Sequence, residues 1–330
     1  MNSWRLAPES CSASVPRHSR LYRAGVLLPF RMHTARPSRT ALLIAKAQIL
    51  LARDPARRHL VPSTTVRIAD ACLRASGQRT WSACCASSAF RGFLAWVERH
   101  SLPGLVLHFA LRKRYIAARV AWAARGGIDQ LVVVAAGCDA LAARISRFRP
   151  GMLAIELDHP ATQAVKVAAL AGSLGVDLAP CDFTTTTAAS VLRAHPRFRV
   201  DRRSVFVLEG LVMYLTAEQV RALVEDVASM CAAGSVLVLT WMETRDGEEP
   251  RFAASGVLAD RWLRFHREPF ASGCSREAMA GILTASGFIV DRIADHRTLG
   301  RIMPRSRIAR GESIVVAVRS DGPTLGAATR

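Results

Sequence analysis

The most informative part of the sequence for the fold is Ser204-Val-Phe-Val-Leu-Glu-Gly-Leu-Val-Met-Tyr-Leu215. Its apolar run from Val205 to Leu208 is typical of a parallel β-strand that is buried on both faces. The run ends in an acid, Glu209, followed by Gly210. Because ligands of open α/β sheets bind just beyond the carboxyl ends of the strands, we expect Glu209 to lie at a ligand site.

The same pattern of an apolar run followed by a helical segment recurs from Asp129 onward. Strands are expected at 131–135, 152–157, 176–180, 204–208, 235–241, 288–293 and 312–319, and helices at 140–147, 162–174, 185–195, 217–233 and 276–286. Alternating strands and helices indicate a mostly parallel sheet with helices on both faces. The fold class is therefore α/β and Rossmann-like.

The residues before this region divide differently. Residues 36–126 are expected to form a helical cap, which includes a long helix over 105–125, while 78–92 show no clear period. Residues 127–320 would form the Rossmann-like domain, and 321–330 a loose tail. Residues 1–35 are rich in Arg and Ser, and we interpret them as disordered or as a misannotated extension, with Met32 as the true start; a transit peptide is the alternative.

The 330 residues carry a formal charge of +19, from 45 Lys and Arg against 26 Asp and Glu. Such a charge would suit a polyanion, but no basic run is interleaved with aromatics in a nucleic-acid-reading pattern, so no nucleic-acid partner is expected. None of the eight cysteines forms a C-x-x-C pair or has His at zinc-finger spacing, so we expect reduced thiols, a cytoplasmic protein and no metal. No apolar stretch reaches the length of a membrane span.

Three further strand ends carry residues that suit a nucleotide. Gly137 follows the first strand, where small residues let a ligand approach the backbone. Asp158 ends the second strand, 19 residues beyond Asp139, about where a Rossmann-type sheet places an acid on ribose hydroxyls. Asp182 and Phe183 follow the third strand, where a carboxylate could bind an exocyclic amine and a ring could lie along a purine. Each of the three acids could instead cap the next helix.

Together these strings resemble those of a known family. Asp129-Gln-Leu-Val-Val-Val-Ala-Ala-Gly-Cys-Asp139, Glu156-Leu-Asp-His-Pro160, Cys181-Asp-Phe-Thr184 and Leu208-Glu-Gly-Leu-Val-Met-Tyr-Leu215 are similar to the ordered motifs of the leucine carboxyl methyltransferase superfamily. The likeness is to its bacterial branch, the class I S-adenosylmethionine-dependent O-methyltransferases. It covers about residues 36–320, and Pro37-Ser-Arg-Thr-Ala41 resembles the start of the family's N-terminal helix.

The resemblance implies a seven-stranded methyltransferase sheet and S-adenosyl-L-methionine as cofactor. It implies that Asp158 binds the ribose, that Asp182 and Phe183 hold the adenine, and that Gly137 and Glu209 approach the methionine part. It also implies an Arg on the preceding helix for the cofactor's carboxylate. Counting back from the first strand assigns this role to Arg112, with Arg114 as the alternative, and a bidentate guanidinium suits a carboxylate.

Two departures from the family pattern concern the cofactor end of the site. Ala135 stands where the family loop carries Gly, which narrows backbone freedom. Ala117 and Ala118 replace the acids that usually follow the Arg, so any contact those acids make is missing here. Cofactor binding is therefore better supported by the sequence than activity.

The sequence leaves the acceptor side open. Tyr214 is the candidate catalytic residue, because it follows the Glu209 turn. A carboxylate acceptor needs no general base, whereas a hydroxyl needs one within about 3 Å, and His266, His159 and Tyr214 are the candidates. Trp262 and Phe265 could set specificity.

We expect an S-adenosylmethionine-dependent O-methyltransferase with a small-molecule hydroxyl or carboxylate acceptor, of the kind found in secondary metabolism. The alternatives are a degenerate, cofactor-binding regulatory member and a nucleotide-cofactor oxidoreductase, which the single glycine disfavours. A nucleic-acid methyltransferase is suggested by charge alone.

Overall fold

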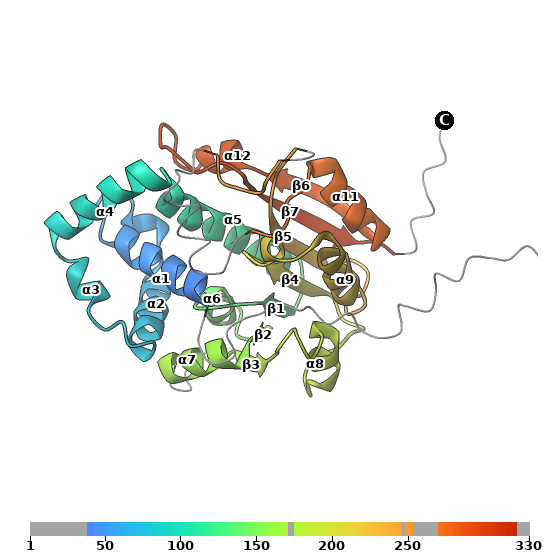
Figure 1. The fold of residues 1–330 in the computed structure, drawn as a ribbon. Coiled ribbons are helices and arrows are strands. Elements are labelled where there is room, and N and C mark those ends of the chain that lie inside the picture. The colour runs from blue at the N-terminus through green and yellow to red at the C-terminus, as the bar shows by residue number, and fades with distance from the viewer. Residues whose placement is uncertain (1–37, 171–174, 246–247, 254–269, 322–330) are drawn as a thin grey trace, which may run out of the picture.

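A computed structural model describes residues 38–170, 175–245, 248–253 and 270–321 of the chain (Figure 1). Its centre is a seven-stranded sheet with the order β3-β2-β1-β4-β5-β7-β6. The strands are β1 (Gln130–Val134), β2 (Leu153–Asp158), β3 (Asp177–Pro180), β4 (Ser204–Leu208), β5 (Val236–Met242), β6 (Phe288–Ala294) and β7 (Glu312–Arg319). All neighbours pair in parallel except β7, which runs antiparallel to both β5 and β6. The expected fold class and all seven strands are confirmed.

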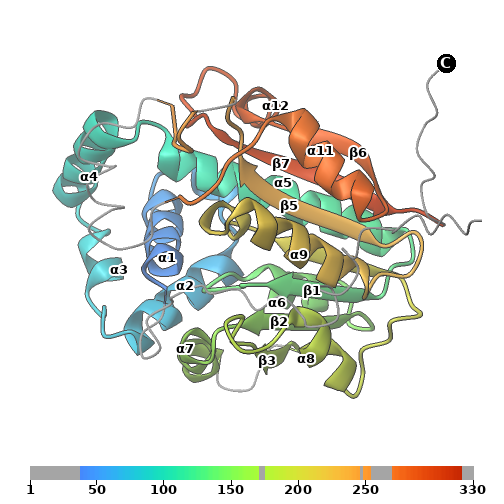
Figure 2. The ribbon, with the colours of Figure 1, turned by 45° about the vertical axis from the view of Figure 1, so that its right-hand side comes forward.

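Helices cover both faces of the sheet (Figure 2). One face packs against α8 (Ala188–Ala194), α9 (Ala217–Ala228) and α11 (Arg276–Ala285). The other packs against α5 (Leu105–Arg125), α6 (Leu141–Phe148) and α12 (His296–Gly300). Helix α9 begins with a capping box, in which Thr216 and Gln219 satisfy each other's backbone N–H groups.

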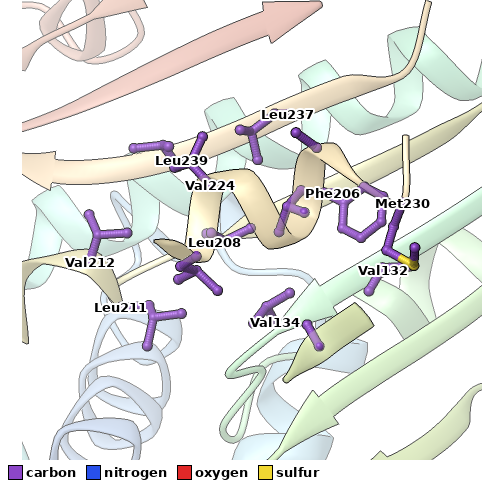
Figure 3. Close-up of a cluster of buried hydrophobic side chains, with 14 of the residues drawn as sticks. Val132, Val134, Phe206, Leu208, Leu211, Val212, Val224, Met230, Leu237 and Leu239 are labelled. Carbon is purple, nitrogen blue, oxygen red and sulfur yellow. The ribbon is translucent and has the colours of Figure 1, made fainter. Parts of the chain in front are cut away.

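Strand β4 shows why its sequence is continuously apolar. Phe206 and Leu208 belong to the core on the α9 side, which Figure 3 shows, whereas Val205 and Val207 belong to the core on the α5 side. All four side chains are fully buried. A strand with a core on each face cannot alternate apolar and polar residues.

The N-terminal helices gather at one side of the sheet in both views (Figures 1 and 2). They are α1 (Arg39–Ala52), the short helix η2 (Arg58–Leu60), α2 (Ser63–Ala75), α3 (Trp81–Cys84) and α4 (Ser88–Ser101). Ser38 caps α1 by accepting a hydrogen bond from the N–H of Ala41 at 3.2 Å, at the helix start that the sequence indicates. Leu42 and Cys72 pack against Cys138 and Ala140, so the cap lies directly on the loop after β1.

Some segments expected from the sequence fall outside the residues that the structure describes. The expected extension over 1–35 lies outside them, as does the expected tail apart from Asp321. Within the described ranges, no helix is both long enough and apolar enough to cross a bilayer. All cysteines in the same ranges are free. Among the residues of these ranges, no three His, Cys, Asp or Glu side chains lie close enough together to hold a metal ion.

Candidate functional site

Register brings three strand ends to one place at the edge of the sheet. Val134 of β1 lies opposite Leu157 of β2 and Leu208 of β4. The next residues of β2 and β4 are the acids Asp158 and Glu209, which therefore flank the loop that follows β1. Sheet geometry alone thus places two carboxylates beside the turn after β1, at the edge where open α/β sheets bind their ligands.

A cavity of about 100 Å³ opens at this edge. Five of the predicted site residues line it, namely Arg112, Gly137, Asp158, Glu209 and Tyr214. Asp182 and Phe183 are not among its lining residues. The cavity therefore unites the residues assigned to the methionine and ribose parts of the cofactor, and leaves out those assigned to adenine.

Arg112, on α5, is the centre of a buried charge network. Its Nε donates to Glu209 at 2.9 Å, and its Nη1 donates to both oxygens of Glu312 at 2.6 and 2.8 Å. The side chains of Arg112, Glu209 and Glu312 are 3%, 7% and 0% exposed. His108 donates one further hydrogen bond to Glu312, from its Nε2 at 2.7 Å.

The charge state of this network follows from its burial and pairing. Burial would lower the pKa of Arg112, but Glu312 and Glu209 raise it above its usual value. Burial likewise would raise the pKa of Glu312, yet Arg112 and His108 bring it down to about 2. Both groups are thus held charged.

One nitrogen of Arg112 is left over from this pairing. Its Nη2 is buried and has no hydrogen-bond partner among the described residues. A buried donor without a partner is costly, so the position calls for an acceptor from a ligand. Because Arg112 lines the cavity, an anionic group bound there could accept this bond.

Lys113 and Asp139 extend the network around the cavity. Lys113 Nζ lies 3.1 Å from Asp139 and 3.1 Å from Glu209. The two cations Arg112 and Lys113 thus pair with three carboxylates, those of Asp139, Glu209 and Glu312, and a fourth, that of Asp158, lines the same cavity. The surplus of acid favours a ligand with net positive charge.

Glu312 and His108 belong to this network although the sequence did not indicate them as site residues. Glu312 is the first residue of β7, opposite Met242 at the carboxyl end of β5. The antiparallel direction of β7 brings its first residue to the ligand edge, and a strand's apolar pattern does not show its direction. An acid heading an otherwise apolar run was the available signal.

Asp158 holds the loop after β1 in place. Its carboxylate accepts hydrogen bonds from the N–H groups of Gly137 and His159. Burial raises the pKa of Asp158, and these two bonds partly oppose the shift. Gly137 has a left-handed φ of 54°, and a Cβ there would meet the Cβ of Ala41 at 3.0 Å, so glycine is the fitting residue.

The same loop stores strain at Ala135, whose φ is also 54°. An alanine pays roughly 1–2 kcal/mol for the left-handed conformation, whereas glycine does not. Allowing for the greater freedom of glycine in the unfolded chain, Ala135→Gly should raise the free energy of unfolding by about 0.5–1 kcal/mol. Denaturant titration would measure this gain. Ala136→Gly, where φ is not left-handed, should lower stability, and equal shifts for both variants would contradict the strain at Ala135.

Glu312 should make the free energy of unfolding depend on pH in the acid range. Its folded pKa of about 2 lies below its ordinary value of 4.5, so its contribution is fully present above about pH 4.5 and is lost as the pH falls through about 2. Glu312→Gln should be less stable at pH 7 and should lose less stability than the wild type between pH 4.5 and pH 2. Urea titrations across this range test it, and parallel pH profiles for the two proteins would refute it.

The adenine candidates lie in a different setting. Asp182 accepts hydrogen bonds from the N–H and the hydroxyl of Thr184, at 2.9 and 2.7 Å, and the hydroxyl bond is the main reason its pKa is lowered. Phe183 packs partly against the core on the α9 side. Their assignment to adenine stays a prediction.

Burial and position relative to the cavity distinguish the remaining candidate residues. Arg114 is exposed and does not line the cavity, so Arg112 is the better placed of the two arginines. His159 is buried, and its Nδ1 accepts from the N–H of Ala161 at 3.2 Å. Tyr214, in the short helix η3 (Val212–Tyr214), lines the cavity. His266, Trp262 and Phe265 lie outside the described residues.

Comparison with known proteins is consistent across sequence and fold. A family model described as leucine carboxyl methyltransferase matches residues 38–228. A candidate S-adenosyl-L-methionine-dependent methyltransferase from Parafrankia sp. (strain EAN1pec) is 33% identical over 164 residues, which cover 47% of this chain and 52% of that protein. Another, from Mycobacterium tuberculosis (strain ATCC 25618 / H37Rv), is 29% identical over 221 residues, covering 62% and 68%.

Among solved structures, the crystal structure of a candidate methyltransferase from Thermobifida fusca YX has a TM-score of 0.51 at 16% identity. The match covers 77% of this chain and 94% of that one, and it shows that the fold is shared. The chain spans about half the length of the first curated relatives it matches. The family model, in contrast, covers more than half of the chain, as 191 of 330 residues fall between 38 and 228. The chain belongs to the leucine carboxyl methyltransferase family.

Proposed function

We propose that this protein is an S-adenosyl-L-methionine-dependent O-methyltransferase that acts on a small-molecule hydroxyl or carboxylate. The observation that carries the proposal is the buried, unpartnered Nη2 of Arg112 at the sheet-edge cavity. A carboxylate of the ligand satisfies it, and the acid surplus around it favours the positively charged rest of an amino-acid-bearing sulfonium. Family membership supports the same cofactor.

The residues present fit the cofactor's parts. Arg112 would bind its carboxylate, Glu209 and Asp139 would offset its ammonium and sulfonium charges, and Asp158 would bind the ribose. Gly137 has no side chain and leaves space for the cofactor to approach the backbone. A cavity of about 100 Å³ is too small for the whole cofactor, so we assign to it the amino-acid end, and assign adenine to the region of Asp182 and Phe183.

When bound, the cofactor supplies a methyl group on a positively charged sulfur. The chain's own residues position the two partners and exclude water, which is the main protein contribution to such a displacement. Tyr214 would lie beside the acceptor, where its hydroxyl can hydrogen-bond to an acceptor hydroxyl and orient it. A carboxylate acceptor is already ionised and needs no base.

Ligand-dependent stabilisation tests the cofactor class. S-adenosylhomocysteine at 100 times its Kd should stabilise the protein by about 2.7 kcal/mol, whereas NAD at the same concentration should not. Thermal unfolding with each compound gives the answer. A shift with NAD alone would favour the oxidoreductase alternative and overturn the proposal.

A labelling experiment separates the remaining alternatives. The protein is incubated with methyl-labelled S-adenosylmethionine and a small-molecule extract, and the product is treated with alkali. A methyl ester releases labelled methanol, whereas a methyl ether does not, so the two acceptor classes are distinguished. If the protein binds the cofactor but gives no labelled product with extracts of the cells that produce this protein, the non-catalytic regulatory alternative is favoured.

A further inference from the structure

A second and larger cavity, of about 510 Å³, adjoins the sheet-edge cavity. The two share five lining residues, which are Thr40, Ile44, Arg112, Gly210 and Tyr214. Its volume lies in the range of small-molecule binding sites. A molecule in the larger cavity therefore meets, at this shared wall, whatever occupies the smaller one.

The larger cavity runs along α1 away from the shared wall. Thr40, Ile44, Ala47 and Leu50 line it at helical spacing, and only the first two also line the sheet-edge cavity. At 1.5 Å per residue, Leu50 lies about 9 Å further along the helix than Ile44. The cavity thus suits an elongated molecule with one end at Tyr214.

The walls of the larger cavity are mostly apolar. Leu105, Val106 and Phe109 line it from α5, and Leu94 and Val97 line it from α4. None of the residues of α4 is buried, which is unusual for a helix with an apolar face. These walls suit an apolar body.

Lys46 contrasts with these walls. It lines the cavity, is half-buried, and holds its ammonium 5.0 Å from the centre of the Trp81 ring. Burial lowers its pKa, and no carboxylate of the described residues lies within ion-pair distance. Glu98, which also lines the cavity, accepts instead from the N–H of Val106 at 3.0 Å. A partly buried cation without a counter-charge is stabilised by an anion from a ligand.

We propose that the larger cavity binds the methyl acceptor, and that the acceptor is an elongated, largely apolar molecule with an anionic group that Lys46 binds. The accepting group lies at the Tyr214 end, and the anion lies further along α1. This inference rests on the proposed function, because the adjoining cavity is a cofactor site only under that function.

Two fluorescent probes with the same aromatic body test the cavity directly. 1-Anilinonaphthalene-8-sulfonate carries an anion, and N-phenyl-1-naphthylamine is its neutral counterpart. Both should bind the full chain, the sulfonate about tenfold more tightly or more, as expected for a hydrogen bond to a charged group. Equal affinities in the wild type would overturn the role of Lys46.

Single substitutions show which residues cause the difference in affinity between the two probes. Lys46→Met should abolish the difference between the probes, while Arg67→Met, which removes an exposed charge from α2, should preserve it. Ala47→Phe should weaken both probes at least tenfold by filling the cavity; Leu43→Trp, at a half-buried position of the same wall, replaces it if Ala47→Phe does not fold. A difference that persists in Lys46→Met, or probe binding unchanged in the filled variant, would refute the proposal.

The same samples are titrated with S-adenosylhomocysteine. The cavity-filling variant should bind it as the wild type does, because Ala47 does not line the sheet-edge cavity. A wild type that fails to bind S-adenosylhomocysteine contradicts the proposed function, while the probe pair reports on the larger cavity by itself.

Discussion

Arg112→Met should lower the free energy of unfolding by roughly 3–5 kcal/mol, the cost of breaking a buried ion pair by removing one partner. Methionine fills much of the space but leaves Glu209 with Lys113 alone, and leaves Glu312 with His108 alone. Glu312 is fully buried, so water cannot replace the lost guanidinium. Denaturant titration at pH 7 measures the change.

Two further variants make this result specific. Arg114→Met removes an exposed arginine two positions along the same helix and should change stability by less than about 0.5 kcal/mol. Adding Glu312→Gln to Arg112→Met should recover part of the loss, because it removes the stranded carboxylate. If Arg112→Met were as stable as Arg114→Met, the charge network would not have the role assigned to it.

Asp158→Ala should weaken S-adenosyl-L-methionine binding tenfold or more, from the loss of hydrogen bonds worth about 1.5–3 kcal/mol. The structure adds a second reason, because the carboxylate also holds the N–H of Gly137 and so fixes the loop after β1. Calorimetric titration of the folded variant measures the loss.

Asp158→Asn distinguishes the loss of ribose hydrogen bonds from the loss of the contact that holds the loop after β1. An amide keeps one acceptor oxygen for the Gly137 N–H and loses the bond from the His159 N–H, so the Gly137 contact should stay in place while ribose binding is still impaired. Asp177→Ala is the matched control, since Asp177 is at the opposite end of the neighbouring strand and pairs with His195 and Arg197. Unchanged affinity in a folded Asp158→Ala variant would refute the ribose assignment.

Much of the fold was predictable because the five strands inside the sheet, β2, β1, β4, β5 and β7, are buried along nearly their whole length. Each of these five appears in the sequence as a mostly apolar run, and the long helix over 105–125 was predicted with the bounds of α5. Residues 78–92 showed no clear period within the expected helical cap, and they hold α3 and the start of α4. Helix α3 has four residues, and neither helix buries a residue, so no core-facing period marks them in the sequence.

The site was predictable where it depends on strand ends. Gly137, Asp158 and Glu209 follow parallel strands in register, so their proximity follows from the topology. Arg112 was found through the resemblance alone, and the structure places it at the same cavity. Glu312 was missed because it lies 200 residues beyond Arg112 and depends on the direction of one strand.

Calorimetric titration of S-adenosyl-L-methionine and NAD, separately, into the full chain tests the cofactor assignment. We expect saturable binding of S-adenosyl-L-methionine at one site per chain, weakened tenfold or more in Asp158→Ala, and no heat from NAD. No heat from S-adenosyl-L-methionine in a folded protein would contradict it.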